Sequence, residues 1–202
     1  MEVIQTDRLR VRTINNQDHE RFFLLQGDPS VMRFIRPIKT RAESDAALNE
    51  MLAAGEPEEG GRWMVEDKET GRFVGTLAII PVPYDTTKIQ LGYALVPAEW
   101  GKGYATEATR ELIRVLNTQP GIFRIGSFVD AENLASARVL IKAGFVEEAI
   151  LQNWFRFPNQ GNVPKDCVLF KIPDLGKARF LDEQNFDIQG KLKNKILREQ
   201  IW

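Results

Sequence analysis

Residues 100–105, Trp-Gly-Lys-Gly-Tyr-Ala, place two glycines around a lysine directly before a helix-forming sequence. An apolar, strand-like run from Ile89 to Val96 precedes them and ends at Pro97. Glycine lets the backbone approach a ligand closely and adopt positive φ at no steric cost. The unpaired N–H groups of a first helical turn, with the positive end of the helix dipole, attract anions. The segment therefore predicts a phosphate-binding turn; the alternative is a tight turn before an ordinary helix.

Two better-known phosphate-binding sequences do not fit this segment. The P-loop pattern G-x-x-x-x-G-K-[ST] is absent from the chain. The dinucleotide fingerprint needs its glycines directly after a strand and a small third residue, whereas here residues 97–100 intervene and Thr106 takes the third place. A Rossmann-type oxidoreductase is therefore not expected.

A second strand–turn–helix unit follows the first. Residues 124–129 have the character of a strand, and Asn133 is a candidate N-cap because its side-chain oxygen can accept from a free N–H of the first turn. Gly144 is placed to end the helix in a left-handed conformation. Apolar residues recur between them at helical spacing: Leu134, Ala137, Leu140 and Ile141. Local capping explains why Asn133 and Gly144 are present. It does not explain why two strand–turn–helix units follow one another with polar groups at the ends of both strands.

Together these segments resemble the GNAT superfamily of acetyl-CoA-dependent N-acetyltransferases, and most closely its ribosomal-protein-alanine acetyltransferase (Rim-type) branch. The acyl-CoA signature of that family, Arg/Gln-x-x-Gly-x-Gly/Ala, is similar to residues 100–105. Its second signature, Asn-x-x-Ser with Lys-x-Gly-Phe downstream, is similar to residues 133–136 and 142–145. Residues 6–12 also resemble the first strand of this branch, so the likeness runs from about residue 4 to about residue 172.

The resemblance implies an α/β (α+β) fold, with a mixed, mostly antiparallel central sheet of about seven strands flanked by helices. The hydrophobic pattern agrees, because runs of strands followed by strand–helix alternation predict a sheet covered by helices. Strands are expected at residues 8–14, 63–66, 73–80, 88–96, 122–129, 145–151 and 166–172. Helices are expected at residues 18–26, 30–34 with Ser30 as cap, 41–54, 104–116 and from 133.

The expected domain covers residues 1–173, and residues 174–202 form an extension outside the resemblance. Ile188, Leu192 and Ile196 are spaced as one apolar helical stripe. We therefore expect a helix that covers either its own domain or a partner subunit, so that the protein is a monomer or a homodimer.

The resemblance also implies the residues that contact acetyl-CoA: Leu95, Val96, Trp100, Gly101, Lys102, Gly103, Tyr104, Ala105, Thr106, Asn133, Ser136, Arg138 and Lys142. In the family a backbone N–H at the end of the central strand stabilises the oxyanion, which here means Leu95 or Val96, because Pro97 has no N–H. Asn133 is expected at the pantetheine arm, and Arg138 or Lys142 at a CoA phosphate.

Transfer of an acetyl group to an amine by direct attack needs a proton donor for the thiolate and a base for the amine. The family pattern assigns the first role to Ser136; a local hydrogen bond at the helix start is the alternative. The base is not identified, since the branch often has Glu where this chain has Gln90. The acidic residues near the relevant strand ends are Glu99, Asp130 and Glu132, none of them preferred, and a water relay is the alternative.

The departures at Gln90 and at Trp100, where the signature has Arg or Gln, support an alternative function, a catalytically silent acyl-CoA-binding module. The acceptor is expected to be a protein N-terminus or a small-molecule amine. In such folds the early helices and the loop between the last strands shape its site, here residues 29–37 and 152–165.

Composition limits the remaining function classes. The chain has 202 residues, which suits one domain, and its net charge of −1 gives no broad positive surface for nucleic acid or membranes. Cys167 is the only cysteine and His19 the only histidine, so no intramolecular disulfide is possible and no metal site is expected. Cys167 also has no histidine nearby in sequence, which argues against a covalent intermediate. The absence of a long apolar run and of a signal peptide predicts a cytoplasmic protein.

Overall fold

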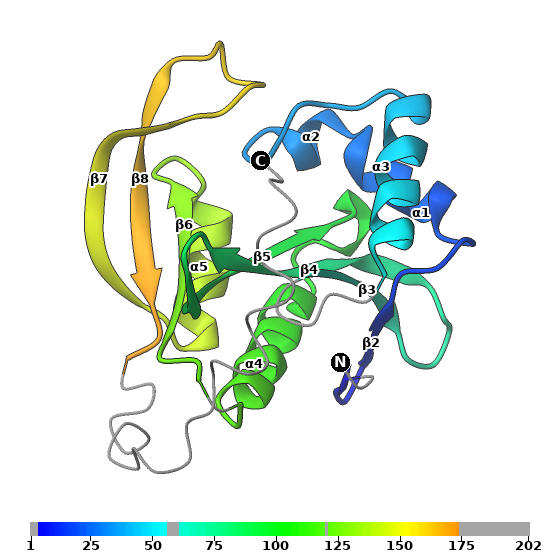
Figure 1. Cartoon of the computed structure of the whole chain (residues 1–202), viewed down its shortest axis with the longest axis horizontal. Coiled ribbons are helices and arrows are strands. Elements are labelled where there is room, and N and C mark those ends of the chain that lie inside the picture. The colour runs from blue at the N-terminus through cyan, green and yellow to red at the C-terminus, as the bar shows by residue number, and fades with distance from the viewer. Residues whose placement is uncertain (1–3, 56–60, 120, 174–202) are drawn as a thin grey trace.

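The computed structural model describes residues 4–55, 61–119 and 121–173 (Figure 1). Its strands are β1 Ile4–Gln5, β2 Leu9–Thr13, β3 Gly61–Asp67, β4 Phe73–Val82, β5 Asp85–Leu95, β6 Arg124–Asp130, β7 Val146–Arg156 and β8 Pro164–Lys171. Its helices are α1 His19–Gln26, α2 Pro29–Met32, α3 Arg41–Ala54, α4 Tyr104–Leu116 and α5 Leu134–Ala143, with a 3₁₀ turn at Pro97–Glu99. The predicted C-terminal helix, and with it the boundary at residue 173, lies outside the described residues.

The described strands form one eight-stranded sheet in the order β1-β2-β3-β4-β5-β6-β8-β7. Neighbouring strands are antiparallel except β5 and β6, which run parallel. The expected mixed, mostly antiparallel sheet flanked by helices is therefore confirmed. Its eighth strand is β1, which the pattern did not predict because two residues are too few to show an alternation.

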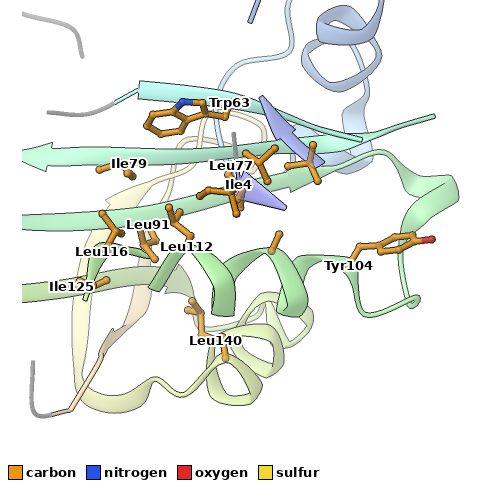
Figure 2. Close-up of a cluster of buried hydrophobic side chains, with 14 of the residues drawn as sticks. Ile4, Trp63, Leu77, Ile79, Leu91, Tyr104, Leu112, Leu116, Ile125 and Leu140 are labelled. Carbon is orange, nitrogen blue, oxygen red and sulfur yellow. The ribbon is translucent and has the colours of Figure 1, made fainter. Parts of the chain in front are cut away.

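Helices cover both faces of the central strands. On one face, α4 packs Leu112 and Leu116 against strand residues such as Leu77 and Leu91, as Figure 2 shows. On the other face, α1 and α2 contribute a smaller cluster. That cluster consists of Leu25, Val31, Met32, Met64, Phe73 and Ala94. Because successive strand residues alternate between faces, each central strand presents separate sets of side chains to the two layers.

Three local expectations were wrong. The cap of α2 is Asp28, whose side chain accepts from the backbone N–H groups of Ser30 and Val31, and not Ser30 itself. The connection expected at residues 81–87 is a shorter turn between β4 and β5, in which Tyr84 adopts φ 64°. Few non-glycine residues take this conformation, so a turn this short at Tyr84 was not expected.

The third difference concerns β7, which runs on to Arg156 where the sequence predicted a loop from residue 152. The pairing of β7 with β8 shifts between Leu151 and Phe155, and Asn153 has φ 49°. An extra unpaired segment of this kind breaks the two-residue alternation by which a strand is recognised.

Candidate active site

The parallel strands β5 and β6 share a short ladder and then cease to pair. The register joins Lys88–Gln90 to Arg124–Gly126, although β5 continues to Leu95 and β6 to Asp130. One further link follows, from Ser127 Oγ to the Leu91 carbonyl oxygen at 2.9 Å. Beyond this link, the described ladder contains no further pairing between β5 and β6, so the last residues of β5 are not hydrogen-bonded to β6.

The glycine-rich turn lies between the end of β5 and α4. Gly101 and Gly103 have φ 74° and 81°, and Gly103 is the N-cap of α4 without any side-chain capping bond. The first helical bond runs from the Glu107 N–H to the Gly103 oxygen, so the N–H groups of residues 104–106 have no backbone partner among the described residues. By contrast, side chains cap α2, α3 and α5. The start of α4 is therefore suited to an external anion.

The connection between β1 and β2 holds this turn in place through Glu107. The Glu107 carboxylate accepts from the hydroxyl of Thr6 and from both the backbone N–H and the guanidinium of Arg8. The Arg8 guanidinium also donates to the Lys102 carbonyl oxygen at 3.1 Å and lies over the Tyr104 ring. A glutamate just after the acyl-CoA signature thus joins sequence positions about a hundred residues apart, which the sequence alone did not indicate.

Backbone geometry distinguishes the two expected oxyanion donors. The Val96 N–H is already bonded to the Val74 oxygen at 3.1 Å. The Leu95 carbonyl accepts from the Trp100 indole Nε1 at 2.7 Å and so points away from β4. Because N–H and C=O of one strand residue point to the same side, the Leu95 N–H is also directed away from β4, toward β6. Val96 is therefore unsuited to donate this bond.

The start of α5 is tied to β5. The Asn133 side chain accepts from the Ser136 N–H at 3.2 Å, and Gly144 ends the helix with φ 104°; both capping roles are confirmed. The Tyr93 phenol oxygen lies 2.8 Å from Ser136 Oγ and 2.9 Å from the Ser136 carbonyl oxygen. Burial raises the pKa of Tyr93 to about 12, against a smaller opposing effect of the Ser136 bond. Tyr93 therefore stays protonated at neutral pH.

The remaining expected CoA contacts lie farther from this place. Lys102 extends to Glu99 with its Nζ at 3.0 Å. Arg138 is exposed on α5, and Lys142 is exposed at the far end of that helix from Asn133. There the Lys142 carbonyl accepts from Arg110 of α4. The structure thus gathers residues 100–106 at one helix start and Asn133 and Ser136 at another, with Lys142 apart from both.

The three acidic residues differ in their surroundings. Glu99 is buried between the cations of Arg72 and Lys102. Glu132 is bound by Lys165 at 2.8 Å, and that bond lowers its pKa. Asp130 is buried at the end of β6 and accepts from the Glu132 N–H and from Gln160 Nε2. Among the described residues, Asp130 is the one of the three without a cation in contact.

Aromatic residues join β6, β7 and the segment after α2 on the face opposite α4. The rings of Phe128 and Phe155 are 5.6 Å apart, Phe155 and Phe157 are 4.9 Å apart, and Phe157 meets Phe34 edge-on at 6.4 Å. Asn159 Nδ2 donates to the Met32 carbonyl oxygen. The two regions expected at the acceptor, residues 29–37 and 152–165, are therefore in direct contact.

Two further observations bear on chemistry. Cys167 is fully buried, and burial raises the pKa of its thiol to about 11, so it has no character of a nucleophile. Across the described ranges, no helix is long and apolar enough to span a membrane.

A turn of glycines at a helix start without a side-chain cap, beside a parallel strand pair that stops pairing, is suited to a phosphate-bearing ligand. A family model for the acetyltransferase (GNAT) domain matches residues 8–146, more than half of the chain, and the chain therefore belongs to the GNAT acetyltransferase family. The likeness inferred from the two signatures is confirmed.

Relatives and solved structures agree with this membership. The Bacillus subtilis protein named uncharacterized N-acetyltransferase YoaA is 27% identical over 172 residues, covering 84% of this chain and 96% of that protein. The RimL ribosomal L7/L12 alpha-N-protein acetyltransferase in complex with coenzyme A superposes with a TM-score of 0.73 at 13% identity, over 84% of this chain and 97% of that one. Spermidine N-acetyltransferase from Vibrio cholerae, with CoA and spermine, gives 0.70 at 20% identity, over 83% and 96%. At these identities the two structures show a shared fold.

Proposed function

We propose that this protein transfers acetyl from acetyl-CoA to a primary amine, a protein N-terminus or a small molecule, by direct attack and without an acyl-enzyme. The uncapped start of α4 behind two positive-φ glycines, next to the end of β5, carries the proposal. The pyrophosphate would accept from the N–H groups of this turn, and the thioester would lie along β5 where β6 no longer pairs with it. The single cysteine fits a cytoplasmic enzyme.

The donor site follows from that placement. Residues 100–106 would hold the pyrophosphate, Asn133 and Ser136 the end of the pantetheine arm, and Arg138 or Lys142 a phosphate at the outer end of CoA. Leu95 would stabilise the oxyanion, since its N–H is directed away from β4 while that of Val96 is engaged. The Trp100 indole supports Leu95 by binding its carbonyl oxygen.

The proposed chemical step is an aminolysis of the thioester. The neutral amine attacks the thioester carbonyl, a C–N bond forms, and the C–S bond breaks to release CoA thiolate. Ser136 would give its hydroxyl proton to the thiolate and take one from Tyr93, whose oxygen is 2.8 Å from Ser136 Oγ; solvent would then return a proton to Tyr93. Asp130 would accept the amine proton, because it is buried at the end of β6 and lacks the cations that hold Glu99 and Glu132.

The test measures free thiol release from acetyl-CoA with a panel of small amines and N-terminal peptides. We expect turnover that falls at least about a hundredfold in Ser136→Ala, the range of general acid catalysis. Gly103→Val should lose acetyl-CoA affinity in calorimetry, because its φ of 81° is strained for a side chain and the branch would crowd the phosphates.

The alternative function makes a different prediction. A silent acyl-CoA-binding module would bind acetyl-CoA tightly, release no thiol with any acceptor, and be unaffected by Ser136→Ala. A Gly103→Val variant that folds and binds acetyl-CoA normally would show that the pyrophosphate is elsewhere.

A further inference from the structure

Arg62 brings a positive charge to the sheet face opposite α4, close to the end of β5. Its Nη1 donates to Thr76 Oγ1 at 3.0 Å, and Thr76 pairs across the sheet with Ala94, the residue before Leu95. Since neighbouring strands are about 4.8 Å apart, the guanidinium lies within roughly 10 Å of the backbone at which the acetyl group is proposed to react.

This charge has no carboxylate partner among the described residues. The chain elsewhere pairs its less exposed guanidiniums with acids, as it does Arg12 with Asp18 and Glu66. Arg62 is half-buried, and burial, followed by the nearby charge of Arg36, lowers its pKa to about 10. A guanidinium that is partly removed from water and faces a second cation gains strongly from an anion.

Arg36 is held over the same face by the β7–β8 connection. Asn159 Nδ2 donates to the Arg36 carbonyl oxygen at 2.6 Å and to that of Met32 at 2.8 Å. The Arg36 side chain is exposed and has no ion pair within the described ranges. The charge of Arg36 acts on Arg62, so two cations from different elements, β3 and the segment after α2, lie near each other on this side of the sheet.

The residues that neighbour Arg62 on this face of the sheet have small side chains. Arg62 pairs with Ala78, and Ala78 pairs with Gly92 of β5. A Cβ built on Gly92 would meet its nearest atoms, Ile80 Cδ1 and Ala78 Cβ, only at 3.7 and 3.8 Å. The sheet between Arg62 and the β5–β6 boundary therefore carries small side chains, with half-buried Gly92 beside buried Ala78.

We propose that the acceptor is an amine that also carries an anionic group, a carboxylate or a phosphate, which Arg62 and Arg36 bind. This inference rests on the proposed acetyl transfer and names its substrate class. The same two cations repel a polyamine, and they favour the neutral form of an amine that binds beside them, because a neighbouring positive charge opposes protonation.

The experiment compares matched acceptors that differ in the anion. Glycine is compared with glycinamide, and O-phosphoethanolamine with ethanolamine, while spermidine serves as a polycation. Each is assayed for kcat/KM with wild-type protein, Arg62→Gln and the control Arg114→Gln, whose residue is an exposed partner of Glu111 on α4. Taking the ratio of variant to wild type for each acceptor cancels differences in amine pKa.

We expect at least one anionic acceptor to exceed its neutral partner by about tenfold or more in wild type. Arg62→Gln should lower kcat/KM for that acceptor by about tenfold or more, mainly through KM, and leave the neutral partner within about twofold. Arg114→Gln should change neither. The stronger of glycine and O-phosphoethanolamine identifies a carboxylate or a phosphate as the anion.

Preference for the neutral amines or spermidine, or an equal loss on both members of a pair in Arg62→Gln, would overturn the anion site while leaving acetyl transfer intact. A calorimetric titration of the same acceptors into protein saturated with CoA tests the anion site separately from acetyl transfer. Anion-dependent binding that Arg62→Gln abolishes, with no thiol release, would keep the anion site and refute the transfer. No binding and no turnover would refute both.

Discussion

The Tyr93 phenol oxygen lies 2.8 Å from the Ser136 hydroxyl oxygen, linking β5 to the start of α5 across the place where β5 and β6 stop pairing. A tyrosine hydroxyl has one proton, which it can donate to either oxygen of Ser136. When Tyr93 donates to Ser136 Oγ, the serine proton is free for a thiolate. This contact turns a serine recognised by its sequence motif into one end of a two-residue proton path.

Removal of the phenol tests that path. We expect Tyr93→Phe to lower kcat about tenfold or more with little change in acetyl-CoA affinity, because the ring remains and only the proton source is lost. The double variant with Ser136→Ala should be no slower than Ser136→Ala alone, since residues that act as a unit are not additive. Steady-state kinetics of the four proteins measure this; additive losses would mean that the two residues act separately.

The titration of Tyr93 gives an independent check of its burial. The difference in phenolate absorbance between wild type and Tyr93→Phe should have its midpoint near pH 12, because burial raises the pKa from 10.0 to about 12. A raised pKa means that the stabilisation is complete below pH 10.0 and is lost as the pH rises through about 12. A midpoint at the ordinary value would show an exposed phenol.

Trp100 is expected to act through Leu95. Trp100→Phe keeps an aromatic ring but removes the indole N–H that holds the Leu95 carbonyl oxygen at 2.7 Å. A neutral hydrogen bond contributes about 1 kcal/mol, so we expect kcat to fall about fivefold. Acetyl-CoA affinity, measured by calorimetry, should stay within about twofold. Weaker binding at unchanged kcat would instead show that Trp100 acts by holding acetyl-CoA and not through Leu95.

Gly75 permits the close approach of β4 and β5 beside Leu95. A Cβ at Gly75 would lie 2.2 Å from the Ala94 carbonyl oxygen and 2.8 Å from Leu95 Cα, both backbone atoms. Gly75→Ala should therefore cost about 1–3 kcal/mol of unfolding free energy in urea denaturation, as overpacking does. Gly92→Ala is the matched control for stability, because its new Cβ has only ordinary contacts. Equal stability of the two variants would contradict this packing.

The Glu107 carboxylate should make stability dependent on acid pH. Burial raises its pKa, but the hydrogen bonds from Thr6 and Arg8 outweigh burial and lower it below 4.5. With a depressed pKa, the stabilisation is present above about pH 4.5 and lost as the pH falls through the folded value. Denaturation between pH 3 and 7 should show a shallower acid dependence for Glu107→Gln than for wild type.

At neutral pH, Glu107→Gln should also be less stable by about 1.5–3 kcal/mol, the range for hydrogen bonds to a charged group. Glu111→Gln, which removes the partner of exposed Arg114 on the same helix, is the control and should change stability by less than about 1 kcal/mol. Parallel pH profiles for wild type and Glu107→Gln would show that this carboxylate does not fasten the turn.

Much of the fold was predictable because its signals are local. The bounds expected for α3 and α4 agree with the structure, since α3 lies between a Thr40–Glu43 capping box and Gly55 and α4 has a clear apolar stripe. The sequence missed β1, the end of β7 and the cap of α2. They depend on a cross-strand partner, an irregular backbone angle and a competing cap two residues away, and none of these appears in a hydrophobic pattern.

The sequence by itself determined the glycine turn, the Asn133 cap and the family, because these depend on residue type and spacing within one strand–turn–helix unit. Tertiary structure decided which backbone N–H faces the β5–β6 boundary, since the pairing of Val96 with Val74 is a contact between strands. It also placed Tyr93 behind Ser136 and left Arg62 without an acid among the described residues. These relationships join residues distant in the chain, where only packing determines which charges and hydroxyls meet.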